Sequence, residues 1–106
     1  MVAQPTGDDL VEILAALANP LRLRIIARLA RGRDYTSRLA REIGVSRPLL
    51  HMHLQRLEAA GLIAGSLELS EDGKAMKFYE VTDFNIHLTA STLADAARTL
   101  TRKEQS

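Results

Sequence analysis

Two short helical patterns on either side of a glycine constrain the fold of this chain more than any other feature of its sequence. The first pattern covers residues 36–43, and the second places Leu50, Leu54 and Leu57 four and three residues apart. This spacing puts the leucines on one helix face, which must pack inward. Gly44, between the two patterns, supplies the backbone freedom of a sharp turn. The segment therefore predicts two helices joined by a tight turn, a helix-turn-helix.

Capping residues mark the boundaries of both helices. Thr36 is the expected N-cap of the first helix, and Ser46 is the expected N-cap of the second. Pro48 stands in the first turn, where proline is tolerated, and Gly61 is a natural stop. We therefore expect the second helix to cover residues 46–60.

The face of the second helix opposite its leucines is the candidate reading surface for DNA. A helix-turn-helix places the N-terminal half of its second helix in the major groove of a duplex. We add the threonine at the start of the first helix to the candidate contacts. The members of this set are Thr36, Arg47, Pro48, His51, Met52, Gln55 and Arg56.

Arginine is concentrated in the middle of the chain, although the formal net charge of the whole chain is only +1. Residues 20–56 contain nine arginines and two acidic residues, a net charge of +7, whereas the remainder contains five basic and eleven acidic residues, a net charge of −6. Segregated charge of this kind favours attraction to phosphates. The alternative is a set of solvated arginines on helix surfaces, each of which contributes little.

Length and composition bound the class of protein. A chain of 106 residues with 46% hydrophobic residues suits one globular domain over residues 1–106. No apolar run approaches the ~20 residues that span a bilayer, and the N-terminus lacks the features of a signal peptide, so we expect a cytoplasmic protein. The sequence has no cysteine, which excludes disulfides and thiolate metal ligands.

Two further function classes are disfavoured by the residues present. With two Phe, two Tyr and no Trp, stacking on several unpaired bases is not expected, which argues against single-strand or RNA binding. The sequence contains no glycine-rich phosphate loop, nucleophile elbow or paired metal-ligand motif, so we expect that the protein is not an enzyme and uses no cofactor.

The remaining sequence predicts three more helices and one hairpin. Helices are expected over residues 8–18 and 21–31, each with one apolar stripe. Tyr35 is expected to form a one-residue bridge to the sheet. After Gly61 the pattern changes to a period of two, as in a strand pair. The predicted fold is mainly α with a two-stranded β-hairpin: a winged helix-turn-helix of about five helices.

The hairpin following the reading helix is a wing. Asp72-Gly73 is a strong hairpin signal between the two strands. Lys74 and Lys77 near the tip could reach a phosphate or the adjacent minor groove. Alternatively, Glu71 and its neighbour Asp72 cancel these lysines, and the hairpin merely covers the core. Both interpretations of the wing stay open at this stage.

The C-terminal pattern predicts a long helix over residues 83–102, which starts near Asp83. Its apolar residues repeat at the four and three spacing of a coiled-coil seam. Together with the helix over residues 8–18 it suggests a two-fold dimer, which would place two reading helices roughly 34 Å apart. The alternative is that the stripe packs within its own subunit. The candidate dimer residues are Leu10, Ile13, Leu14, Leu17, Ile86, Ala90, Leu93, Ala97 and Leu100.

Three stretches carry a family resemblance. ALANPLRLRIIARLARG, LAREIGVSRPLLHMHLQRLEAAGLI and the wing ending KFYEVT resemble the ArsR-type winged-helix transcriptional regulators, over nearly all of the chain after its first few residues. The resemblance implies a homodimeric repressor with its first and last helices at the dimer interface, and an inducer that lowers DNA affinity. It also implies DNA contacts at Ser46, Arg47, Leu49, His51 and His53.

The resemblance stops short of the metal-sensing members of that family, whose cysteine pair and C-terminal ligand set are absent. His51 and His53 project about 200° apart on a helix and cannot share an ion. His53 also lies near the leucine stripe, where a packed residue is expected. Asp83 and His87, four residues apart, are the better metal candidates, although a capping aspartate and a surface histidine are more common.

One function of another class remains open. A winged helix can present the same helix and hairpin to another protein, without reading DNA. Steep weakening of duplex binding with salt would favour DNA over an apolar protein interface. The sequence does not identify the operator, the existence or identity of an inducer, or whether transcription is repressed or activated.

Overall fold

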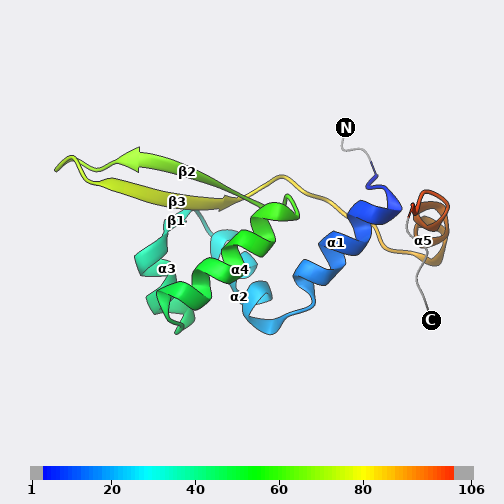
Figure 1. The fold of residues 1–106 in the computed structure, drawn as a ribbon, viewed down its shortest axis with the longest axis horizontal. Helices are drawn as coiled ribbons and strands as arrows, with labels where there is room; N and C mark the ends of the chain where they lie inside the picture. The colour runs from blue at the N-terminus through cyan, green and yellow to red at the C-terminus, as the bar shows by residue number, and fades with distance from the viewer. Residues whose placement is uncertain (1–3, 102–106) are drawn as a thin grey trace.

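The computed structural model describes residues 4–101 of the protein, which form an elongated body of 52 × 32 × 21 Å. Figure 1 shows α2, α3 and α4 gathered below the sheet, with α1 leading away from them towards α5. None of the helices within these residues is long and apolar enough to cross a membrane. In chain order the elements are α1 (Gly7–Leu17), α2 (Pro20–Leu29), β1 (Asp34–Tyr35), α3 (Thr36–Ile43), α4 (Arg47–Ala59), β2 (Ile63–Leu69), β3 (Ala75–Val81) and α5 (Ala90–Ala97).

The first four helices lie close to their predicted positions. The α1–α2 boundary is set by Asn19, whose side-chain oxygen accepts hydrogen bonds from the backbone N–H groups of Leu21 at 2.9 Å and Arg22 at 3.2 Å. Pro20 follows as the first residue of α2, where its missing N–H costs nothing. The cap at Asn19 and the proline that follows it therefore define Pro20 as the first residue of α2.

The helix-turn-helix is confirmed as α3 and α4. Gly44 ends α3 with a φ of 84°, a left-handed conformation that glycine adopts without strain. Ser46 caps α4 by accepting a hydrogen bond from the Leu49 N–H at 3.3 Å. The prediction that Thr36 is the N-cap of α3 is wrong: Tyr35 occupies that position, and the Thr36 hydroxyl donates to the Lys77 carbonyl at 3.4 Å.

The leucine stripe of α4 is the centre of the core. Leu50, Leu54 and Leu57 each have 0% exposed surface. Burial of a leucine side chain contributes roughly 1.5–3 kcal/mol, so this stripe largely determines how α4 is oriented. The stripe packs with buried residues of the other elements, which are Ala16, Ile25, Leu29, Leu39, Ala40, Leu62, Ile63 and Tyr79.

The sheet has three antiparallel strands in the order β1-β3-β2. β1 pairs Tyr35 with Phe78, so the predicted one-residue bridge is a two-residue strand beside the wing. Leu67 and Leu69 alternate with polar residues as expected, yet they are 69% and 76% exposed. The cause is that the outer half of the hairpin extends beyond the helices, as Figure 1 shows.

The C-terminal helix is shorter than the sequence pattern predicts, and a helix starting near Asp83 is wrong. Residues 82–89 are not helical, and α5 begins only at Ala90. Thr89 and Thr92 cap it reciprocally: each side-chain oxygen accepts a hydrogen bond from the other's backbone N–H, at 2.9 and 3.1 Å. The helix ends at Ala97 and residues 98–101 are not helical, so the predicted continuation of the helix to residue 102 is wrong as well.

Residues 82–89 are extended because they connect two distant parts of the fold. The Thr82 N–H donates to the Leu62 carbonyl at 3.0 Å, which holds this segment to the sheet at its start. The segment must then reach the far end of α1 (Figure 1). Eight extended residues can span up to about 27 Å, whereas eight helical residues span about 12 Å. The required reach therefore outweighs the helical pattern.

α5 packs against the start of α1 in the same chain. The Gly7 N–H donates to the Thr99 hydroxyl at 2.7 Å, and a Cβ on Gly7 would lie 2.3 Å from the Ala96 carbonyl oxygen. Part of the C-terminal stripe thus packs within its own subunit, in agreement with the alternative interpretation. Leu93 and Leu100 nevertheless remain 43% and 44% exposed.

A buried ion pair joins α2 to β1. Asp34 is only 2% exposed, and its Oδ2 lies 2.7 Å from Arg28 Nη2. Its other carboxylate oxygen accepts a hydrogen bond from the Tyr35 N–H at 2.8 Å. Arg28 also pairs with the exposed Glu42, and this contact lowers the pKa of the Glu42 carboxyl. Loss of Arg28 would leave the Asp34 charge buried beside a much weaker partner, Arg38, 3.8 Å away.

We predict that Arg28→Ala lowers the free energy of unfolding by about 3 kcal/mol, because breaking a buried pair leaves an uncompensated charge. Urea unfolding at neutral pH measures the change. Arg33→Ala is the matched control, because Arg33 pairs with Glu68 on the surface. Equal effects of the two variants would contradict the account of Asp34 as a buried, paired carboxylate.

Candidate nucleic-acid interface

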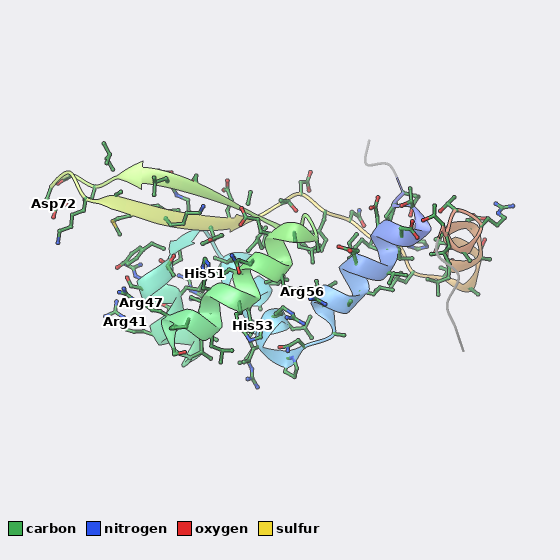
Figure 2. All side chains as sticks on the ribbon, in the orientation of Figure 1. Arg41, Arg47, His51, His53, Arg56 and Asp72 are labelled. Carbon is green, nitrogen blue, oxygen red and sulfur yellow. The ribbon has the colours of Figure 1, made fainter. Side chains whose placement is uncertain are left out.

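The outer face of α4 is open to solvent. The leucines of α4 point into the core, so the side chains on the opposite face project outward along a helix of 13 residues. The predicted contacts that lie exposed on this helix or at its cap are Ser46, Arg47, Pro48, Leu49, His51, Met52, Gln55 and Arg56. Figure 2 shows Arg47 at the start of α4 and Arg41 on α3, at the same end of the helix-turn-helix.

His53 departs from the set that the resemblance implies. Its side chain is buried, with 7% exposure, so a direct DNA contact by this residue is inconsistent with the structure. Arg22 Nη1 lies 3.4 Å from His53 Nδ1. If Arg22 donates this bond, the ring proton sits on Nε2, which has no hydrogen-bond partner within the described residues. The prediction that this histidine is packed is confirmed.

A groove between α4 and the wing brings four of the predicted contacts together. It has a volume of about 520 Å³ and is lined by Thr36, Arg47, Lys74 and Lys77. Three cations therefore surround one open space, although one comes from α4 and two come from the β3 side of the wing. Tyr35, Ser37, Ala75 and Met76 complete the lining.

The position of Lys77 depends on Gly65 in the neighbouring strand. A Cβ on Gly65 would lie 2.7 Å from Lys77 Cε, so the absence of a side chain leaves room for the lysine. Its ammonium lies 5.6 Å from the centroid of the Tyr79 ring, within the range of a cation–π contact. Lys77 is thus packed along the hairpin, whereas Lys74 lies at its exposed tip.

One of the two acidic residues at the wing tip, Asp72, is held by a hydrogen bond. The Ser70 hydroxyl and the Asp72 carboxylate are hydrogen bonded, and this contact lowers the pKa of Asp72. Figure 2 shows Asp72 at the far end of the hairpin. Asp72 therefore stays ionised near neutral pH, and the tip carries both signs of charge. The cationic part of the wing is the side that lines the groove, not the tip as a whole.

The arginine-rich segment does not form one uniform basic face. Arg28 and Arg33 are paired with acidic residues, and Arg28 lines a hollow between α2 and α3 together with Arg24 and Arg31. Arg56 lines a separate hollow with residues of α1, away from the groove. Within residues 4–101, the arginines with no ion pair to an acidic side chain are Arg22, Arg24, Arg31, Arg41, Arg47 and Arg56.

Four groove residues were not among the sequence-predicted contacts: Tyr35, Ser37, Ala75 and Met76. Tyr35 and Ser37 line the groove because β1 pairs with β3 and brings the start of α3 under the wing. Ser37 lies in the first turn of α3, and a serine at the start of this helix is a local signal that could have identified it. The pairing of Tyr35 with Phe78 is a long-range contact that no short pattern reveals.

The metal candidates are not brought together. Asp83 and His87 lie in the non-helical segment, so a spacing of four does not place them on one helix face. Within the described residues, no group of three or more His, Asp or Glu side chains could hold a metal ion. The prediction that these two residues share a helix face is therefore wrong.

Comparison with known proteins gives consistent matches. Residues 17–65 match the model of a helix-turn-helix domain. The chain is 34% identical over 80 residues to an uncharacterized HTH-type transcriptional regulator of Methanocaldococcus jannaschii. The aligned residues cover 76% of this chain and 83% of that protein. It is 30% identical over 90 residues to the HTH-type transcriptional repressor SmtB of Mycobacterium tuberculosis, over 84% of this chain and 63% of SmtB.

A solved structure extends this likeness to the fold. It is the homodimeric winged helix-turn-helix DNA-binding domain of a possible ArsR-family regulator from Mycobacterium bovis, with a TM-score of 0.63 and 24% identity, over 92% of this chain and 82% of that one. The fold and the exposed helix beside the wing define a winged helix-turn-helix domain. With the M. jannaschii protein as a relative, this chain belongs to the family of HTH-type transcriptional regulators.

The buried histidine generates a pH prediction. Burial and the nearby Arg22 guanidinium lower the pKa of His53 in the folded chain. In the unfolded chain the His53 imidazole takes up a proton near its ordinary pKa of about 6.5, which is above its pKa in the folded chain. The unfolded state therefore binds more protons below that pH, so the stability contributed by neutral His53 is present above a pH of about 6.5 and is lost as pH falls. We predict that His53→Gln reduces the loss of unfolding free energy between pH of about 7.5 and 5.

Urea unfolding over this pH range measures the effect. His51→Gln is the matched control, because His51 is two residues away on the exposed face of the same helix. This control should keep the wild-type pH dependence. If His53→Gln keeps it as well, neutral burial of His53 does not contribute to stability.

Proposed function

We propose that this protein is a homodimeric, sequence-specific repressor that reads the major groove of duplex DNA with α4. The single observation that carries the proposal is the exposed outer face of α4 beside a groove lined by Arg47, Lys74 and Lys77. A major groove about 12 Å wide admits one α-helix. The proposed role requires neither a catalytic group nor a cofactor, and it is exerted in the cytoplasm.

The exposed side chains of α4 suit different parts of the duplex. Arg47 can donate two hydrogen bonds to guanine, and Gln55 can pair with adenine in the same bidentate manner. Met52 offers an apolar contact to a thymine methyl group, and His51 can bond a base edge or a phosphate. These four side chains carry the proposed sequence readout, with Ser46, Pro48 and Leu49 close to the backbone at the helix start.

The groove between α4 and the wing is proposed to hold the phosphate backbone. Its cations come from two elements that lie next to each other only in the folded chain. Lys74 and Lys77 would contact phosphates while α4 enters the adjacent major groove, and Thr36 and Ser37 add hydroxyl groups. Contacts of this kind fix the register of the protein and carry little sequence information. Arg56 lies apart from this groove and is proposed to contribute less.

The proposed dimer uses the exposed apolar side chains of α1 and α5. Val11 and Leu14 of α1 and Leu93 of α5 remain exposed within one chain, and Leu100 follows α5 on the same part of the molecule. The similar domain from M. bovis is a homodimer. Pairing of two copies would bury these side chains and place two α4 helices about 34 Å apart, one turn of DNA. Ile13, Leu17, Ile86, Ala90 and Ala97 complete the proposed interface set, whereas Leu10, with 7% exposure, is already buried within its own chain.

Repression is proposed because the M. tuberculosis relative is a repressor. A dimer seated on DNA would act by occupying its site. A second candidate function is favoured by one observation: Leu67 and Leu69 form an exposed apolar surface on the wing, which could contact another protein. Salt dependence separates the two functions, since only phosphate contacts release counterions.

We predict that duplexes selected from a random pool by the purified protein bind with strong salt dependence. Arg47→Ala and the double variant Lys74→Ala/Lys77→Ala should each weaken binding and reduce the slope of log affinity against log salt by about 0.9 for each phosphate that the variant no longer neutralises. Gln55→Ala should weaken binding about tenfold at fixed salt without a change of slope. Fluorescence anisotropy titrations over a series of salt concentrations measure both quantities.

Arg24→Ala is the matched control for charge, because Arg24 is an α2 residue that lines the hollow between α2 and α3 and not the groove beside α4. It should leave the slope nearly unchanged. Unchanged affinity in both Arg47→Ala and Gln55→Ala would show that the outer face of α4 does not read the duplex.

We predict that Leu93→Lys shifts the purified protein from dimer to monomer, because it places a charge in the proposed apolar interface. Sedimentation equilibrium measures the molar mass. Leu69→Lys is the control, since this wing leucine is even more exposed and lies far from α5. If both variants keep the wild-type mass, α5 is not the dimer surface.

A further inference from the structure

One arginine of α2 connects three helices. Arg22 Nε donates a hydrogen bond to the Ala16 carbonyl, in the last turn of α1, at 2.7 Å. Its Nη1 lies 3.4 Å from Nδ1 of His53, on the buried face of α4. A single half-buried guanidinium therefore contacts the end of α1 and the middle of α4 while its own backbone belongs to the first turn of α2.

The chemistry of arginine suits this position. The guanidinium is planar and rigid, so two of its nitrogens hold two acceptors at a fixed separation, which a single ammonium cannot do. A cation beside the last carbonyls of a helix also interacts favourably with the partial negative charge there. Asn19 and Pro20 fix the start of α2, and Asn19 accepts the Arg22 backbone N–H. Hydrogen bonds thus hold both the backbone N–H and the guanidinium of Arg22.

α1 connects the body that contains the DNA-reading helix to α5, and α1 and α5 together carry the proposed dimer surface. Figure 1 shows α1 running from α2 and α4 to α5, at the other end of the molecule. Near the C-terminal end of α1, where it meets the DNA-binding body, Ala16 is fully buried. The angle of α1 at this end therefore sets where the partner copy stands relative to α4.

We propose that Arg22 is a positioning residue that fixes the angle between α1 and α4 and thereby sets the half-site spacing that the dimer accepts on DNA. The inference rests on the proposed function as a dimeric DNA reader. It gives the buried His53 a role as the acceptor that anchors Arg22 to α4, in place of the DNA contact that the family resemblance implied.

A small change of angle is enough to matter. A helix of 11 residues is about 16 Å long. A tilt of about 12° at its end moves the far end by about 3.4 Å, the rise of one base pair. Two subunits double the displacement. A loosened α1 would let the two α4 helices match more than one spacing, whereas a fixed α1 selects one.

The test uses the full chain and duplexes recovered by selection from a random pool. The spacer between the two half-sites of the selected duplex is lengthened or shortened by one and two base pairs, and a duplex with one half-site is included. Wild-type protein should bind a duplex whose spacer is changed by one base pair about tenfold or more weakly than the selected duplex. A loss of this size is similar to the cost of one mismatched base pair in a binding site. Arg22→Gln should lose less than about threefold, with unchanged affinity for the single half-site.

Three further variants serve as controls for the test. Arg24→Gln, two residues along α2 and exposed, is the matched control and should keep the wild-type spacing preference. His53→Leu removes the acceptor while it keeps an apolar side chain in the core, so it serves if Arg22→Gln does not fold. His53→Gln, which retains an acceptor, should restore at least part of the preference. Cooperative urea unfolding establishes that each variant is folded.

The outcomes are distinguishable. Spacing tolerance in Arg22→Gln and His53→Leu, with single half-site affinity intact, supports the inference. If wild type shows no spacing preference, or if both folded variants keep it, the inference fails while DNA binding stands. If wild type binds no duplex, the proposed function itself fails.

Discussion

Burial of the α4 leucines is the interaction on which the rest of the structure depends. Leu50, Leu54 and Leu57 are fully buried, so only one face of α4 can point inward. The opposite face is then exposed as a consequence of packing and not as an independent feature. The same packing draws α2, α3 and the sheet around α4, and the pairing of β1 with β3 carries the start of α3 under the wing. The cationic groove exists because these elements share one core.

Electrostatics refine this arrangement but do not create it. Residues 20–56 carry most of the arginines, yet pairing with Asp34 and Glu68 neutralises the charges of Arg28 and Arg33. The buried pair of Arg28 with Asp34 also joins α2 to β1. The cations left beside α4 are few and come from both α4 and the wing. A net charge along the sequence is therefore a weaker guide to a DNA-binding face than the location of the unpaired side chains.

The sequence predicted the parts of the fold that are governed by local signals. Helix periodicity, the Ser46 cap and the glycine at residue 44 identify the helix-turn-helix, and Asp72-Gly73 identifies the hairpin. The start of the C-terminal helix could not be predicted, because the 4-3-4-3 apolar spacing begins in residues that are extended. What decides their conformation is the distance from the sheet to α1, a property of the whole fold.

The candidate site divides in the same way. Exposure of Arg47, His51 and Gln55 followed from the position of the leucines, whereas the groove required the three-dimensional pairing of Tyr35 with Phe78. His53 shows the limit of resemblance: it matches a family position on the reading helix, yet it packs against Arg22. Its spacing from Leu50 and Leu57, at three and four residues, was the local signal that favoured a buried side chain.

The central claim is that the outer face of α4, with the adjacent groove, is the surface that meets duplex DNA. The most direct measurement is the change in backbone amide NMR signals of the full chain when a duplex selected from a random pool is added. The account predicts that the largest changes fall on residues 46–55 of the cap and α4, on the start of α3 and on the β3 side of the wing. Changes confined to the exposed leucines of β2 or to α1 and α5, with α4 unaffected, would contradict it.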